Sequence, residues 1–107
     1  MDDNNAKLIF SALIQSLYGA SMISMGKIPD PISGEVDINL QQASANIDMI
    51  DALKIKTAGN LDKEESTLID TVLTNLRLTY IDEVERQKED TPPETSQQES
   101  KDDKTEE

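Results

Sequence analysis

The ten residues KTAGNLDKEE (residues 56–65) decide how this chain folds, because they separate two segments of helical apolar periodicity. Gly59 is suited to the left-handed backbone that ends many helices. Asp62 can cap a following helix, since Glu65 lies three residues later and completes a capping box. The stretch therefore predicts a corner between two helices, formed by Thr57, Gly59, Asn60, Asp62 and Glu65.

The same stretch does not match a ligand-binding loop. A calcium loop needs oxygen ligands at alternating positions before its glycine, and Lys54, Lys56 and Ala58 cannot supply them. A phosphate-binding loop needs an earlier glycine and a Gly-Lys pair, and both are missing around Gly59. We therefore interpret residues 56–65 as a corner between two helices.

Apolar residues recur at helical spacing on both sides of the corner. Before it, Asn39 is a predicted N-cap with Gln42 three residues later, and one helical face carries Leu40, Ala43, Ile47, Ile50 and Leu53. After it, residues 63–86 predict a helix whose apolar stripe is Ile69, Val72, Leu73, Leu76, Tyr80 and Val84. Together these segments predict a helical hairpin.

An uncharged segment, residues 8–25, predicts a further helix over about residues 5–25, with Gly26 at its end. The segment is short for a membrane span, which takes about 20 apolar residues, and it contains Gln15 and several serines. It also lacks the basic start of a signal peptide. We expect a buried helix of a cytoplasmic protein, and membrane association through this helix is an alternative.

The fold class that follows is all-α, with three helices in one small domain. The hairpin of the second and third helices packs with the first, and the domain covers residues 1–87. Residues 88–107 contain no Val, Ile, Leu, Met or aromatic residue, so we expect a disordered acidic tail. A domain of this size hides only about 60–65% of its unfolded surface, so its core is thin.

The charge and residue types restrict function. With 22 acidic and 10 basic residues the net charge is −12, which repels nucleic acid and argues against it as a partner. The chain contains no cysteine and no histidine, so we expect no catalytic residues and no cofactor. Asp48 and Asp51 are weak candidates for a metal site, and a small carboxylate-dependent enzyme or metal-binding protein is an alternative.

Besides its inward apolar face, each helix of the hairpin carries apolar residues that point away from that face. These residues indicate that the domain buries a further surface. The residues predicted for this interaction face are Met49, Ala52, Leu78 and Ile81. A homodimer is the commonest way to bury such a face. We therefore expect a non-enzymatic interaction or assembly component that is a homodimer, with an unidentified protein partner as a further possibility.

An ordered pattern along most of the foldable chain is similar to a known family. It comprises Phe10 and Leu13, Gly26, Pro29-Asp30-Pro31, Gly34-Glu35, Ile47-Asp48, the string from Lys56-Thr57 to Glu64-Glu65, and Leu76-Arg77 with Tyr80. The chain resembles the bacterial domain-of-unknown-function family numbered eighteen forty-four. This resemblance implies a small, mostly helical protein with no assigned activity or cofactor.

Overall fold

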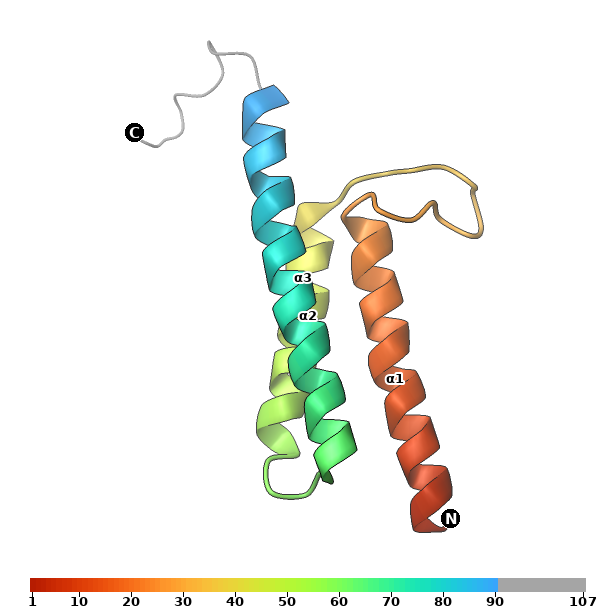
Figure 1. Cartoon of the computed structure of the whole chain (residues 1–107). Coiled ribbons are helices and arrows are strands. Elements are labelled where there is room, and N and C mark those ends of the chain that lie inside the picture. The colour runs from red at the N-terminus through yellow and green to blue at the C-terminus, as the bar shows by residue number, and fades with distance from the viewer. Residues whose placement is uncertain (91–107) are drawn as a thin grey trace.

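The computed structural model describes residues 1–90, which form three α-helices: α1 (Asp3–Ser24), α2 (Leu40–Lys56) and α3 (Lys63–Asp90). The chain rises through α1, descends through α2 and rises again through α3, so α2 is antiparallel to both other helices (Figure 1). Every pair of helices is in contact. No strand occurs in the described part of the chain, and the predicted all-α, three-helix class is confirmed.

Capping side chains set the helix starts. Asn39 accepts a hydrogen bond from the backbone N–H of Gln42 at 3.0 Å, so the predicted cap of α2 is confirmed. The side chain of Gln42 donates to Asn46 instead of returning to Asn39, and the capping box is therefore only half formed. α1 begins two residues before the expected Asn5, because Asp2 accepts from the N–H of Asn5 at 2.8 Å.

α3 continues to Asp90, beyond both the expected helix end at Arg86 and the predicted domain boundary at residue 87. The predicted disordered acidic tail begins at Lys88. Apart from residues 88–90, which belong to α3, that prediction lies outside the described residues.

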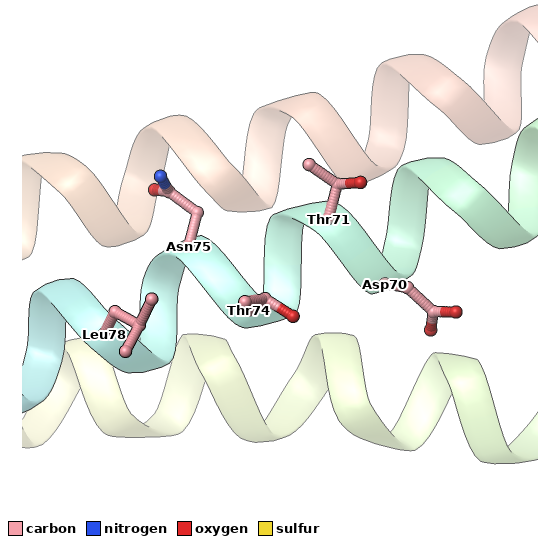
Figure 2. Close-up of a pocket in the computed structure, with 5 residues that line it drawn as sticks. All are labelled: Asp70, Thr71, Thr74, Asn75 and Leu78. Carbon is pink, nitrogen blue, oxygen red and sulfur yellow. The ribbon is translucent and has the colours of Figure 1, made fainter.

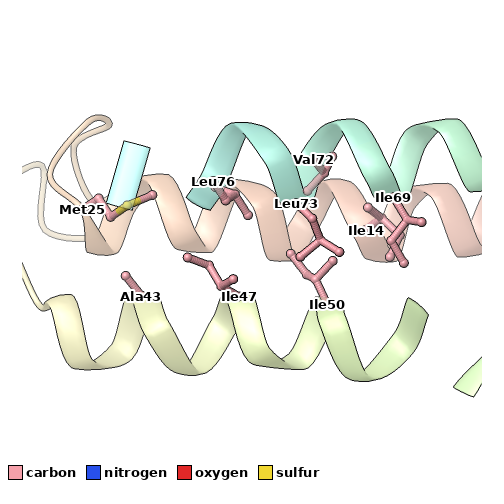
Figure 3. Close-up of a cluster of buried hydrophobic side chains, with 9 residues drawn as sticks. All are labelled: Ile14, Met25, Ala43, Ile47, Ile50, Ile69, Val72, Leu73 and Leu76. Carbon is pink, nitrogen blue, oxygen red and sulfur yellow. The ribbon is translucent and has the colours of Figure 1, made fainter. Parts of the chain in front are cut away.

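A single apolar core lies between the three helices. Figure 3 shows side chains of α2 directed at those of α3, with contributions from α1 at two levels; the buried residues are Ile14, Met25, Ala43, Ile47, Ile50, Ile69, Val72, Leu73 and Leu76. The predicted inward faces of α2 and α3 supply seven of them. Tyr80, expected in the stripe of α3, is packed against this core and partly buried.

α1 contributes one buried apolar residue, Ile14, and Met25, the C-cap residue after its end, contributes another. The helix has two apolar stripes: the one that contains Ile14 and Tyr18 faces inward, whereas on the one that contains Ile9 and Leu13 these residues are 55% and 44% exposed. Between the helices, the Tyr18 hydroxyl donates to the Asn75 side-chain oxygen at 3.2 Å, and Figure 2 shows Asn75 pointing from α3 towards α1. α1 is thus held by one fully buried apolar residue and by four that pack partly buried against the core: Phe10, Leu17, Tyr18 and Met22.

The connection over residues 25–39 is fastened to α3 by a buried ion pair. The Lys27 ammonium lies 2.8 Å from the Glu83 carboxylate, whose side chain is only 3% exposed. The amide of Gln87 also donates to Glu83 at 2.9 Å. Hydrogen bonds from Lys27 first, and from Gln87 second, hold the pKa of the Glu83 carboxyl below its usual value.

Two glycines of this connection have the same backbone conformation but different surroundings. Gly26 has φ 77° and Gly34 has φ 76°. A Cβ added at Gly26 would lie 2.6 Å from Cγ1 of Ile38, whereas nothing lies within 4 Å of a Cβ at Gly34. Gly26 is therefore required both by its conformation and by the close approach of Ile38.

We expect Gly26→Ala to lower the free energy of unfolding by more than Gly34→Ala does. Both alanines incur the left-handed strain of about 1–2 kcal/mol, and only the alanine at residue 26 also displaces Ile38. Urea unfolding of the two variants and the wild type measures the difference. Equal losses would show that Ile38 does not constrain this turn.

We expect Lys27→Met to destabilise the protein by roughly 2 kcal/mol at neutral pH, because it removes the nearest cation from the buried Glu83 and leaves only Gln87 and, at 3.9 Å, Arg86 beside it. A carboxyl with a lowered folded pKa contributes stability above its unfolded pKa and loses it as pH falls through the folded pKa. The difference from wild type should therefore shrink under acidic conditions. Chemical unfolding against pH measures it.

The matched control for that variant is Lys63→Met, which removes an exposed lysine at the start of α3. Surface substitutions of this kind usually change stability by less than about 0.5 kcal/mol. A loss at residue 27 no larger than at residue 63, or one independent of pH, would contradict the structural role of the ion pair.

Candidate functional site

The corner after α2 is built by short-range hydrogen bonds. Thr57 is the C-cap of α2, and its side-chain hydroxyl donates to the Leu53 carbonyl at 2.7 Å. The N–H of Asn60 donates to the Thr57 carbonyl at 2.9 Å and closes the turn. Gly59 has φ 83°, the left-handed backbone expected of it, but it lies inside this turn, two residues beyond the cap.

Asp62 and Glu65 form a complete capping box at the start of α3. The N–H of Glu65 donates to the Asp62 carboxylate at 2.8 Å, and the N–H of Asp62 donates to the Glu65 carboxylate at 2.9 Å. The predicted corner between the two helices is confirmed. Both carboxylates satisfy backbone donors that a helix start leaves unpaired, so this geometry is that of a helix terminus.

Lys7 of α1 also reaches this corner, and sequence reasoning did not place it there. Its ammonium forms ion pairs with Asp62 at 3.0 Å and with Glu64. The hydrogen bond to Glu64 first, and that to Asp62 second, raise the pKa of Lys7 to about 12. The only signal in the sequence is that Lys7 is the one cation of the first helix.

A polar pocket of about 540 Å³ lies beside this ion pair, where the start of α1 meets the corner. Its walls include Asp3, Lys7, Thr57, Asn60 and Glu65. The backbone N–H of Glu65 first, and Lys7 second, keep the pKa of the neighbouring Asp62 carboxyl below its usual value. At this pocket, Asp62 and Glu65 are engaged in the capping box, and Lys7 is engaged in its ion pairs.

The two carboxylates proposed as metal candidates do not act together. Asp51 pairs with Arg77 of α3 at 3.1 Å, whereas Asp48 is exposed. Lys54 pairs with Asp70 at 2.8 Å, across the same α2–α3 seam. Residues 1–90 hold no group of three or more acidic side chains placed to bind a metal ion.

The residues of the predicted interaction face lie on two separate surfaces. Met49 and Ala52 line a groove of about 420 Å³ between α1 and α2, together with Leu13, Leu17, Leu53 and Lys56. Lys56 is the only residue of this lining with a polar side chain. This surface is called the α1–α2 groove below.

Leu78 belongs to a different and more polar surface. It lines a shallow pocket on α3 with Asp70, Thr71, Thr74 and Asn75, and Figure 2 shows these side chains spread along the outer side of α3. Ile81, one turn further along, is 58% exposed. The structure therefore brings Met49 and Ala52 together, adds Leu13 and Leu17 to them, and places Leu78 elsewhere.

α1 also has a length and an apolar composition compatible with crossing a membrane. Such a helix is weak evidence, because core helices of soluble proteins and signal sequences meet the same criterion. In this structure α1 buries Ile14 and Met25 between α2 and α3.

The comparison with known protein families agrees with the resemblance drawn from the sequence. The family described as Domain of unknown function (DUF1844) matches residues 7–82, which include the corner and most of all three helices. No curated protein and no solved structure matches the chain. The chain belongs to the DUF1844 family.

At the corner we expect Asp62→Ala to lower the Tm at neutral pH, because it removes the cap of α3 and a partner of Lys7. The pKa of Asp62 is lowered in the folded state, so its contribution is present above the unfolded pKa and is lost as pH falls through the folded pKa. The two proteins should therefore converge in Tm under acidic conditions. Thermal unfolding across pH measures this.

Asp62→Asn separates the two roles of the carboxylate, since asparagine is also a good N-cap but carries no charge. Asp62→Asn should lower the Tm by less than Asp62→Ala does. If the asparagine variant were as unstable as the alanine variant, the ion pair with Lys7 rather than capping would account for the effect of Asp62.

Proposed function

We propose that this DUF1844 protein is a non-enzymatic interaction or assembly component that acts in the cytoplasm as a homodimer. The observation that carries the proposal is the α1–α2 groove, an exposed strip whose lining is apolar except for Lys56. Contiguous apolar surface on a soluble protein usually marks an interaction site. The occupant proposed for the groove is a second copy of this chain.

The apolar surface around the groove extends beyond its lining. On α1 it continues to Ile9, 55% exposed, and on α2 to Ile55, 66% exposed. Each of these side chains gains free energy when it leaves water, by about 25 cal/mol per Å² of apolar area. Residues 1–90 bury nine apolar residues in their core. For a core of this size, each further apolar side chain buried in a dimer adds a relatively large share of the total stability.

The available chemistry supports a binding role over catalysis. The chain has no histidine or cysteine. Two of the carboxylates that line the polar pocket, Asp62 and Glu65, are engaged in capping, and Asp62 also pairs with Lys7. The net charge of −12 opposes binding to nucleic acid and to anionic lipid surfaces.

Membrane association through α1 is a second candidate, favoured by the length of that helix and by Leu8, which is 69% exposed. Crossing a bilayer would require α1 to leave the bundle and withdraw Ile14 and Met25 from the core. Association of the intact bundle with the membrane surface would leave α1 in place. Recovery of the full-length chain in the membrane fraction would favour this candidate over the first.

We expect Met49→Lys to convert a dimer of the full-length chain to a monomer. An ammonium group buried at the interface without a partner costs several kcal/mol, which corresponds to at least a 100-fold weaker association. Light scattering at two concentrations tenfold apart measures the mass. The matched control is Leu78→Lys on the outer side of α3, which should remain dimeric.

Two results would contradict the proposal. A wild-type chain that is monomeric at both concentrations would exclude a stable homodimer. A dimer disrupted by the control at residue 78 and not by the substitution at residue 49 would place the interface on α3 instead of on the α1–α2 groove. Circular dichroism confirms in each case that the variant is folded.

A further inference from the structure

We infer that two copies pair through α2 in antiparallel orientation, with the two-fold axis at the level of Ala52, so that Asp48 of each copy faces Lys56 of the other. The inference rests on the homodimer proposed above and specifies its geometry. It is carried by the arrangement of side chains on the outer face of α2, the face directed away from the core.

The outer face of α2 has an apolar stretch between two charged residues, and the exposed Gln41 lies on the same face nearer the helix start. Ala45 and Ala52 are exposed, Met49 is 49% exposed and Ile55 is 66% exposed. The charged residues there are Asp48 and Lys56, both exposed. Neither of them forms an ion pair within the described part of the chain, whereas Asp51 and Lys54, on the side facing α3, both do.

These residues are arranged symmetrically about Ala52. Asp48 and Lys56 lie four positions before and four positions after it, and Met49 and Ile55 lie three positions on either side. In an antiparallel helix pair related by a two-fold axis, residues equally far before and after the axis lie at the same level. The level next to Ala52 therefore contains Asp48 and Met49 of one copy with Ile55 and Lys56 of the other.

Placing the axis at either charged residue brings like charges together. An axis at the level of Asp48 would set two carboxylates against each other, and an axis at Lys56 would set two ammonium groups against each other. Parallel pairing of the helices would do both at once. Antiparallel pairing at Ala52 gives two pairs of opposite charge, and like-charge contacts across an interface are the strongest means of excluding an alternative arrangement.

Small residues at the crossing point allow the two backbones to come close. The side chain at the axis is Ala52, and Ala45 lies on the same face two turns earlier. Helices with small residues at their contact approach to about 8 Å between axes. Leu13 and Leu17 lie beside Met49 and Ala52 in the α1–α2 groove, so α1 adds apolar surface to the same interface.

The test exchanges the two charges in the full-length chain. Asp48→Lys places two lysines at each charged contact, and Lys56→Asp places two carboxylates there, so each variant should dimerise about tenfold more weakly than wild type. The double variant, with both substitutions in one chain, should recover wild-type association. An equimolar mixture of the two single variants should form the heterodimer in preference to either homodimer, as read by native mass spectrometry.

A cysteine at the axis gives an independent measurement, because the natural chain contains none. Ala52→Cys should form a disulfide-linked dimer under mild oxidation, since a disulfide needs Cα atoms within about 7 Å. Ala12→Cys, an exposed alanine of α1 outside the groove lining, is the control and should not cross-link at a comparable rate.

The outcomes separate this inference from the proposed function. A wild-type dimer whose charge variants associate equally well, without preference for the heterodimer and without cross-linking at residue 52, would overturn the antiparallel arrangement and leave the homodimer intact. A wild-type chain that is monomeric would exclude both the antiparallel arrangement and the homodimer. Recovery in the double variant, a preferred heterodimer and rapid cross-linking at residue 52 would together establish the arrangement.

Discussion

The structure depends on how α1 packs against the hairpin of α2 and α3. Two fully buried side chains are central to this packing. Ile14 and Met25 are both 0% exposed and insert between α2 and α3. Full burial of such side chains contributes about 1.5–3 kcal/mol each, against the entropy cost of ordering a long helix. Phe10, Leu17, Tyr18 and Met22 of α1 add partly buried apolar contacts to the same core.

Polar contacts at both ends of α1 add to these apolar contacts. Near its start, Lys7 pairs with Asp62 and Glu64, where the charges are partly screened by water. Beyond its end, Lys27 pairs with the buried Glu83. The two sites lie at opposite ends of the bundle, so together they fix the position of α1 along the hairpin as well as its distance from it.

The parts of the fold that depend on neighbouring residues could be predicted from the sequence. The Asp62–Glu65 capping box and the left-handed backbone of Gly59 are determined by residues close in sequence. On α2 and α3 the main apolar stripe is also the face that packs in the core. Periodicity alone cannot choose between the two apolar stripes of α1. The choice depends on where Ile14 fits among side chains of the other helices.

Long-range pairs could not be predicted for the same reason. Lys7 and Glu64 are 57 residues apart, and Lys27 and Glu83 are 56 apart, so no local spacing connects them. The interaction face was also incompletely predicted. Met49 and Leu78 both point away from the core, but whether two outward residues share a surface depends on the angles between helices, which the sequence does not specify.

The contrast between the outer faces of α2 and α3 bears on where a partner would bind. On α3 the exposed positions that flank Leu78 are mostly polar, and they include Thr71, Thr74 and Arg77. On α2 the outward positions between Asp48 and Lys56 are small or apolar, with Ala52 between Met49 and Ile55. A helix face that serves only to meet water gains nothing from such residues, since charged side chains would maintain solubility and helix formation equally well. The two charges that this face does carry, Asp48 and Lys56, are too far apart on one helix to neutralise each other, and an antiparallel second copy brings each of them opposite its complement.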